Sequence, residues 1–306
     1  MIDNVETAII GGGFSGLLAA IHLKGLDPDC GVVVLEQGGY PIQNNAFMIL
    51  PPLARQLLKR IGPLNDYKFN EGRFLIFKIA DFERDVVIET VDTAVVNYHD
   101  FIQMLLQIAM SIGVEVYRNH PALKVDARNK RIEISGGAFI GYSSIIEAAG
   151  AAASVICERV LFEHSIVDSD IYCYPMQCAY TFERADNNAI YKVVPAEDNL
   201  PKTYSDTIKI GDMNGYIDHF IDIHTRYTVV SAIYAAEAVY SGKGARAYYR
   251  NMDSIADDIK YSLFVRRLIS EDNRLIRTPG FSEILTSVLM FGTPYRKLHE
   301  NLYHGR

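Results

Sequence analysis

The chain has 306 residues, of which 49% are hydrophobic and 22% are charged, and its formal net charge is −7. This acidic balance, without a basic stripe, argues against a general nucleic-acid binder. No stretch approaches the roughly 18 apolar residues that cross a bilayer, and the N-terminus lacks the basic region of a signal peptide. These observations favour a cytoplasmic protein that buries one large core or two interleaved domains.

The first elements that the sequence predicts are a strand over residues 5–10, a helix over 14–25 and a second strand over 31–36. Both are predicted to be buried strands, which would begin a parallel sheet covered on two faces. A helix opened by proline follows over 50–62. The β-branched and aromatic residues over 72–96 then predict two or three strands.

A helix over residues 99–113 comes next, because its apolar side chains fall on one helical face. The strands expected after it cover residues 114–117, 123–127, 131–135 and 144–150. Residues 160–200 are rich in strand-forming residues but irregular, and a short strand is expected over 207–210. Helices are expected over 225–240 and in 246–306.

The segment between the first strand and the first helix fits the pattern G-x-G-x-x-G through Gly11, Gly13 and Gly16. The first glycine permits a sharp turn, the second lets the backbone approach a diphosphate, and the third lets the helix pack on the strand. Glu36 closes the second strand 20 residues after Gly16, where a carboxylate can accept hydrogen bonds from an adenosine ribose. The spacing predicts a dinucleotide site, with a glycine-rich turn of an unrelated α/β fold as the alternative.

Three segments in chain order resemble the flavoprotein oxidoreductases of the geranylgeranyl reductase and aromatic-hydroxylase type. "IIGGGFSGLLAAIHL" with "VVLEQG" looks like the motif that holds the adenosine and diphosphate of FAD. "SSIIEAAGAAAS" resembles the second motif of that family, and "IKIGDMNGYIDHFIDIHTRYTVV" resembles the third, a strand into Gly-Asp followed by a loop and a helix. The resemblance covers most of the chain.

The resemblance implies an α/β fold, with a Rossmann-like parallel sheet, a small antiparallel crossover sheet, an inserted strand-rich substrate domain and C-terminal helices. The implied parts are an FAD-binding domain over residues 1–66, 94–159 and 200–245, a substrate domain over 67–93 and 160–199, and a helical segment over 246–306.

The resemblance also assigns roles in holding FAD. The implied residues are Gly11, Gly13, Phe14, Ser15 and Gly16 for the diphosphate, Glu36 for the adenosine ribose, Gln37 as a further cofactor-binding residue, Ala122 for adenine, Gly150 in the second motif, and Gly211 with Asp212 for the ribityl chain. Ala149 stands where the family has Asp, and residues 219–224 replace a glycine-rich loop. His219 and His224 fall beside the flavin in this resemblance, which makes them candidates for proton transfer, with space-filling loop residues as the alternative.

The implied activity is that of an FAD-dependent oxidoreductase that reduces or hydroxylates a hydrophobic or unsaturated small molecule, with NAD(P)H as a candidate electron donor. The departures from the family pattern support an alternative, a catalytically altered relative that binds FAD or another ligand without redox turnover. A third interpretation is an NAD-dependent dehydrogenase. Cys173 and Cys178 lack a second pair, so no metal site is predicted. The basic residues over 296–306 predict a solvated helix face, with peripheral membrane contact as the alternative.

Overall fold

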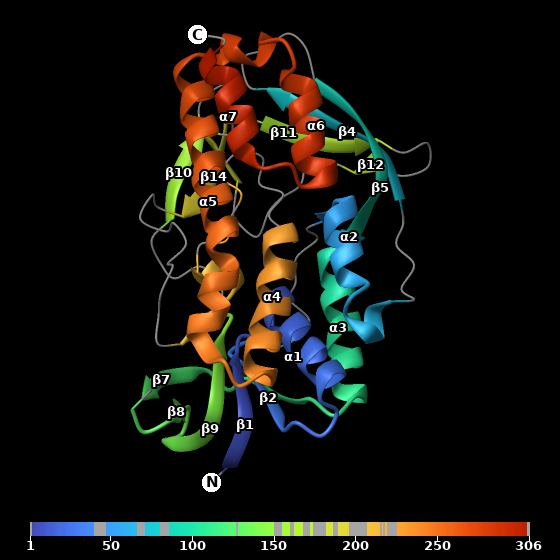
Figure 1. The fold of residues 1–306 in the computed structure, drawn as a ribbon. Coiled ribbons are helices and arrows are strands. Elements are labelled where there is room, and N and C mark those ends of the chain that lie inside the picture. Colours follow the sequence, from blue (N-terminus) through green and yellow to red (C-terminus); the bar gives the residue numbers. More distant parts are fainter. Residues whose placement is uncertain are drawn as a thin grey trace.

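The structure is a computed structural model. It describes residues 2–39, 47–65, 71–79, 86–126, 128–149, 155–159, 162–167, 172–173, 182–185, 189–195, 207–214, 216, 218 and 225–304. The N-terminal strand lies at one end of the molecule and the C-terminal helices lie at the other (Figure 1).

Sheet A forms the N-terminal end of the molecule. Its strands are β1 (Ile2–Ile10), β2 (Val32–Glu36), β6 (Glu115–Arg118), β7 (Ala122–Asp126), β8 (Arg131–Ile134), β9 (Ala138–Glu147) and β15 (Ile208–Lys209). Strands β6, β2, β1, β9 and β15 pair in parallel in that order, and β7, β8 and β9 form an antiparallel ladder. The predicted parallel sheet with a small antiparallel crossover is therefore confirmed.

Helices α1 (Phe14–Leu26), α3 (Tyr98–Ser111) and α4 (Thr225–Tyr240) pack on one face of sheet A. Helix α1 is apolar on all sides because it lies between the sheet and the other two helices. Its Leu17, Leu18 and Ile21 have no exposed surface, and burial of each such side chain contributes about 1.5–3 kcal/mol. This core holds the carboxyl ends of β1 and β2 in place.

Two antiparallel sheets lie beyond sheet A. Sheet B pairs its strands in the order β12 (Tyr172–Cys173), β11 (Phe162–Val167), β4 (Glu71–Ile79), β5 (Val86–Asn97) and β3 (Phe47–Leu50). Sheet C pairs β10 (Val155–Arg159), β14 (Ala189–Pro195) and β13 (Phe182–Ala185). Residues 72–96 thus contain two long strands, within the predicted two or three. Because β5 runs continuously through residue 94 and pairs with β3, sheet B includes residues on both sides of the predicted boundary at 93/94. The division into domains stays a prediction.

Two predicted elements have different bounds in the structure. The helix expected over residues 50–62 is shorter, with α2 at Pro52–Leu58 and a separate 3₁₀ turn, η1, at Gly62–Leu64. The chain leaves the helical conformation between the two, where Ile61 is extended with a φ of −87° and a ψ of 100°. The strand expected over 144–150 begins earlier, since the first part of β9 continues the ladder with β8.

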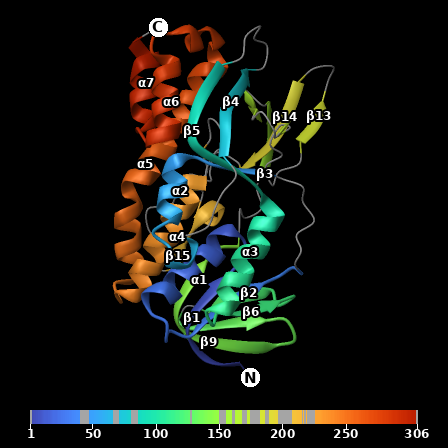
Figure 2. The same cartoon turned by 90° about the vertical axis from the view of Figure 1, so that its right-hand side faces the viewer.

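The C-terminal segment is helical, as predicted. It contains α5 (Gly244–Glu271), the 3₁₀ turn η4 (Asn273–Arg277), α6 (Phe281–Phe291) and α7 (Tyr295–His304). Helix α5 contacts β15 at one end and α7 at the other, so it connects the two halves of the molecule (Figure 1). Figure 2 shows α6 beside β5 of sheet B, which it contacts. Within the described residues, no helix combines the length and the apolar character needed to cross a membrane.

Candidate functional site

The turn over residues 11–16, here called the glycine turn, joins β1 to α1 and requires glycine at two positions. Gly11 has a φ of +106°, and a Cβ atom on it would lie 2.3 Å from the carbonyl oxygen of Ala148 at the end of β9. A Cβ atom on Gly16 would lie 1.9 Å from the carbonyl oxygen of Gly11. Both obstacles are backbone atoms, so no side-chain rearrangement can make room. Gly13 differs, because its nearest neighbour would be the Tyr98 hydroxyl at 4.0 Å, which leaves that side of the turn open.

The N-terminus of α1 faces this open side without a side-chain cap. Gly13 is its N-cap residue and supplies no side-chain hydrogen bond, and the first turn contains no acidic residue. The first turn of a helix carries backbone N–H groups and the positive end of the helix dipole, which together favour an anion. Phe14 anchors the turn from behind, with its ring centroid 5.7 Å from that of Phe101 in α3. The residues present therefore fit a diphosphate.

Glu36 at the end of β2 is already oriented toward the glycine turn. Its Oε2 accepts a hydrogen bond from the Gly12 amide over 2.7 Å, and its Oε1 accepts one from the Gly38 amide over 2.8 Å. These two amides fix the carboxylate beside the turn, and each oxygen has a further lone pair available for a ligand hydroxyl. Gln37, the next residue in the chain, is exposed. The position of Glu36 is the one that a ribose-binding carboxylate requires.

The carboxyl ends of β2 and β6 meet beside this carboxylate. The His120 amide donates to the Glu36 carbonyl over 2.9 Å, and the Asn119 amide donates to the Gly38 carbonyl over 3.3 Å. Asn119 has a φ of +57°, a conformation that asparagine tolerates better than most residues. The sequence analysis did not single out Asn119 or His120, although an Asn just after a strand indicates a turn. Ala122 begins β7, where it pairs with Ile134 in the crossover ladder.

A second corner, where β15 ends at Gly211, lies directly against the glycine turn. Gly211 has a φ of +57°, and a Cβ atom on it would lie 2.9 Å from Ser15 Oγ. Its amide donates to Ser231 Oγ in α4 over 3.1 Å. Asp212 follows in the 3₁₀ turn η3 (Gly211–Asn214). The structure thus brings together two motifs that are about 200 residues apart in the chain.

Three of the predicted site residues, Gly150, His219 and His224, lie outside the described residues. Asp218 is described and is buried, with 1% of its surface exposed. Asp218 lies seven residues before Thr225, where α4 begins, so it does not cap that helix. Instead, the Tyr295 hydroxyl of α7 donates to Asp218 Oδ2 over 2.7 Å.

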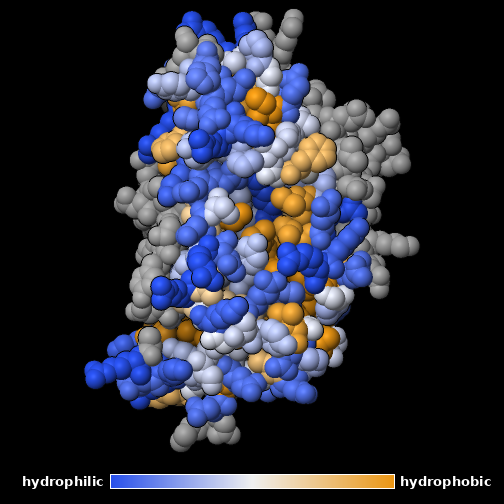
Figure 3. Space-filling view, in the orientation of Figure 1, coloured by the Kyte–Doolittle hydropathy of each residue, from blue (hydrophilic) through white to orange (hydrophobic). Residues whose placement is uncertain are grey.

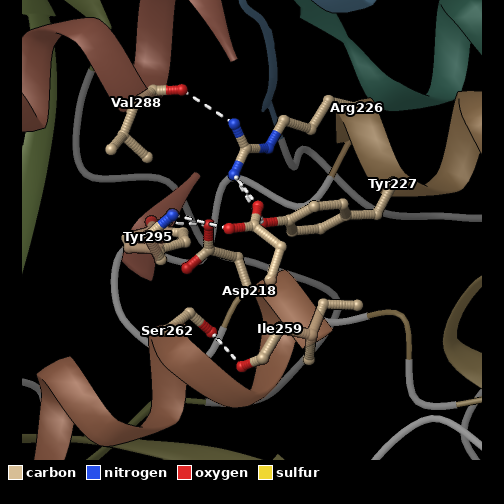
Figure 4. Close-up of polar contacts among 8 residues, drawn as sticks. Asp218, Arg226, Tyr227, Ile259, Ser262, Val288 and Tyr295 are labelled. Atoms are coloured by element: carbon tan, nitrogen blue, oxygen red, sulfur yellow. Dashed lines mark hydrogen bonds and ion pairs between the residues drawn. The ribbon is translucent and has the colours of Figure 1, made fainter. Parts of the chain in front are cut away.

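Asp218 belongs to a buried polar cluster that the sequence analysis missed, here called the Arg226 network (Figure 4). Its members are Asp218 of the segment before α4, Arg226 and Tyr227 of the first turn of α4, Asp258 of α5 and Tyr295 of α7. Arg226 donates to Asp258 Oδ2 over 3.0 Å, to the Val288 carbonyl in α6 over 2.7 Å, and to the Tyr227 hydroxyl. The sequence contained a signal for this cluster, because Arg226 is the single arginine of a largely apolar helix and lies at its start.

Burial and charge determine the protonation states in the Arg226 network. Burial alone would lower the pKa of Arg226, but Tyr227 and Asp258 outweigh it and raise that pKa, so the guanidinium stays charged. Burial raises the pKa of Tyr227 well above its usual value, and burial together with Asp218 does the same for Tyr295. Both phenols therefore remain protonated and act as hydrogen-bond donors. The Arg226 guanidinium is the one cation among the members of this network, which contains two carboxylates, those of Asp218 and Asp258. Hydrogen bonds from the two tyrosines therefore also stabilise these carboxylates.

Comparisons of sequence find no relatives, whereas comparisons of structure find many. Neither a protein-family model nor a curated protein sequence matches the chain. Flavin-dependent brominase Bmp2 is similar with a TM-score of 0.68 at 13% identity, over 99% of this chain and 100% of that one. A 2-methyl-3-hydroxypyridine-5-carboxylic acid oxygenase is similar with a TM-score of 0.63 at 13% identity, over 96% and 98%.

A geranylgeranyl bacteriochlorophyll reductase-like protein from Thermoplasma acidophilum is similar with a TM-score of 0.60 at 12% identity, over 98% of this chain and 100% of that one. All three cover nearly the whole of both chains, so the likeness extends beyond sheet A and the helices packed on it. The resemblance that the motifs suggested is thereby confirmed at the level of fold. The chain has the flavoprotein fold that these oxygenase, brominase and reductase-like structures share.

Proposed function

We propose that the protein is an FAD-dependent oxidoreductase that acts on a hydrophobic or unsaturated small molecule. One observation carries this proposal: the Gly211 corner touches Ser15 of the glycine turn, while Glu36 is held beside the same turn. An extended dinucleotide needs such a continuous arrangement, with its ribose, diphosphate and sugar-alcohol chain at successive positions along one edge of the sheet. The flavoprotein fold supports the same proposal.

Each part of the cofactor has a proposed partner. Glu36 would accept hydrogen bonds from the adenosine ribose, and the backbone of the glycine turn with the first turn of α1 would hold the diphosphate. Gly211 and Asp212 would hold the ribityl chain. Gln37, Ala122 and Gly150 stay predictions at the adenosine side and in the second motif.

Bound flavin supplies the redox chemistry, namely the exchange of a hydride or an electron pair with substrate and donor. The protein's part is to bind, to orient the substrate and to exclude water. His219 and His224 are the proposed proton-transfer residues, because the third motif leads from the Gly211 corner into their segment. NAD(P)H is the proposed electron donor.

The proposed substrate is a small apolar molecule. Figure 3 shows apolar surface near the centre of the displayed face, where Figure 1 places α2, α4 and the end of α6. Phe291 at the end of α6 has 73% of its surface exposed, and contiguous exposed apolar surface commonly marks a site of binding. A cytoplasmic location is part of the same proposal.

The absorption spectrum of freshly purified protein tests this function. The proposal predicts bound FAD, with visible flavin absorption that bleaches on addition of NAD(P)H or dithionite and returns with an oxidising substrate. A colourless protein that takes up no added FAD would overturn the proposal. Bound FAD that dithionite reduces but no candidate substrate reoxidises would indicate the catalytically altered relative instead.

A further inference from the structure

Asp258 of α5 is the centre of the Arg226 network, because it joins α5 to two other helices. Its Oδ2 accepts hydrogen bonds from Arg226 over 3.0 Å and from the Tyr227 hydroxyl over 2.8 Å, both in the first turn of α4. Its Oδ1 accepts one from the Tyr295 amide at the start of α7 over 2.6 Å. One largely buried carboxylate therefore connects the first turn of α4 to the C-terminal helices.

Tyr295 makes a second connection from α7 to the segment that follows the Gly211 corner. Its hydroxyl donates to Asp218 over 2.7 Å, and the Asp218 side chain is buried. Figure 4 shows the Tyr295 ring beside Asp218, with Arg226 and Tyr227 on the other side. Arg226 also stacks over the Tyr295 ring, with its Cζ 5.6 Å from the ring centroid. Tyr295 of α7 thus contacts both the segment before α4, through Asp218, and the first turn of α4, through Arg226.

Helix α4 connects this network to the proposed cofactor site. Ser231 lies five residues beyond Arg226 on the same helix. Its hydroxyl accepts the hydrogen bond from the Gly211 amide over 3.1 Å and donates to the Thr228 carbonyl over 2.9 Å. A helix moves as a stiff unit over one or two turns, so the position of Arg226 determines the position of Ser231 and, through it, that of the Gly211 corner.

We propose that Asp258 and Tyr295 are positioning residues for the dinucleotide. They fix the first turn of α4 and Asp218, and α4 then holds the Gly211 corner against Ser15. This inference rests on the proposed function, and it assigns to the C-terminal helices a role in preorganising the cofactor site. Preorganised sites bind more tightly because less ordering remains to be done on binding.

The first test is hydrogen exchange in Tyr295→Phe, which removes one hydroxyl and keeps the ring. In the full-length protein without FAD, the Gly211 amide is expected to exchange about tenfold faster than in the unaltered protein, a typical size for coupling between sites. The Leu17 amide, which donates to the Gly13 carbonyl, reports on α1 and is expected to keep its rate. Tyr303→Phe, also on α7 and 63% exposed, is the matched control and should change neither amide.

The second test is FAD affinity and the visible circular dichroism of bound FAD, which loss of stability alone does not change. Tyr295→Phe is expected to weaken FAD binding about tenfold and to alter the dichroism, whereas Tyr303→Phe does neither. Asp258→Asn is expected to act in the same direction, with Asp257→Asn as its exposed neighbour control. Tyr295→Phe remains the decisive variant if Asp258→Asn does not fold.

The outcomes separate the two proposals. Unaltered protein that binds no FAD overturns the proposed function and this inference with it. Protein that binds FAD equally well before and after Tyr295→Phe, with an unchanged Gly211 exchange rate, overturns the inference and leaves the function standing. A lowered melting temperature with unchanged dichroism and affinity shows that the network only stabilises the fold, and it also overturns the inference.

Discussion

The glycine turn and the Arg226 network differ in what holds them in place. In the glycine turn, backbone meets backbone: Gly11 and Gly16 leave no space for a Cβ atom, and Glu36 is held by two main-chain amides. In the Arg226 network, long side chains of α4 and α7 meet two carboxylates, the buried Asp218 and the largely buried Asp258 of α5. The first region therefore depends on shape, and the second depends on charge and hydrogen bonding.

The two parts of the candidate site, the glycine turn and the Gly211 corner, are therefore supported in two different ways. In the proposed site, the glycine turn would present backbone amides to the diphosphate and would need no side chain to do so. The Gly211 corner instead is attached to α4, and α4 is attached to the C-terminal helices through the Arg226 network. Substitutions in the two regions should consequently fail for different physical reasons.

The largest expected effect is in the Arg226 network. Arg226→Met removes the guanidinium and leaves the buried Asp258 carboxylate without its cation, which costs about 3–5 kcal/mol of the free energy of unfolding. Denaturant titration measures the loss. Arg296→Met, which breaks an exposed ion pair with Glu300 on α7, is the control and should leave the melting temperature unchanged. Equal effects of the two substitutions would contradict the role given to burial.

The glycine turn should respond to a single methyl group. Gly16→Ala places a Cβ atom on the Gly11 carbonyl oxygen, and the forced backbone shift should cost about 3 kcal/mol of stability and abolish FAD binding. Gly62→Ala adds the same methyl group where no atom lies within 4 Å, so it should leave both unchanged. Thermal unfolding measures the stability, and titration with FAD measures the affinity for the cofactor. Full FAD affinity in Gly16→Ala would show that the turn does not hold the diphosphate.

A buried histidine should make the half of the molecule that contains sheet A sensitive to acid. Burial, with a contribution from Arg60, lowers the pKa of His22 in α1 from 6.5 to about 4. The unfolded chain therefore takes up a proton more readily, and stability should fall as the pH drops from 6.5 toward 4, by up to about 3 kcal/mol. Chemical denaturation between pH 6.5 and 4 should show this fall in the free energy of unfolding for the unaltered protein. His22→Leu should lose the part of the fall that protonation of His22 causes. His304→Gln, a substitution of an exposed histidine, should retain the full dependence of stability on pH.

The smallest expected effect concerns the proposed ribose partner. Glu36→Gln replaces one carboxylate oxygen by an NH₂ group that cannot accept a hydrogen bond from the Gly12 or Gly38 amide. FAD binding should weaken about tenfold, since a hydrogen bond to a charged group contributes roughly 1.5–3 kcal/mol. Fluorescence titration measures the change, with Glu115→Gln on β6 as the control. A larger effect of Glu115→Gln than of Glu36→Gln would contradict the assignment of the ribose position.

The sequence predicted one of these regions and missed the other for a physical reason. Gly11, Gly13 and Gly16 lie within six residues, and their spacing expresses a local steric requirement that can be read directly. The resemblance assigned Ser15 and Gly211 to one FAD molecule, and the structure places the two side by side, because parallel strands bring their carboxyl ends to one edge.

The Arg226 network joins residues that are far apart in the chain. Tyr295 and Asp218 are separated by 77 positions, and no local spacing relates them. The arginine in an apolar helix indicated that a buried partner must exist, but the choice of Asp258 over its neighbour Asp257 depends on how α5 packs against α4. Such packing follows from the whole fold and not from any one segment.

We propose above that an adenine dinucleotide spans the glycine turn and the Gly211 corner. Titration calorimetry of the purified, ligand-free protein with FAD, ADP and FMN tests it most directly. If one ligand occupies both positions, FAD should bind at least about 100-fold more tightly than either of these fragments, because the rest of the molecule binds without a further loss of translational freedom. ADP or FMN binding as tightly as FAD, or no binding of FAD at all, would contradict the claim.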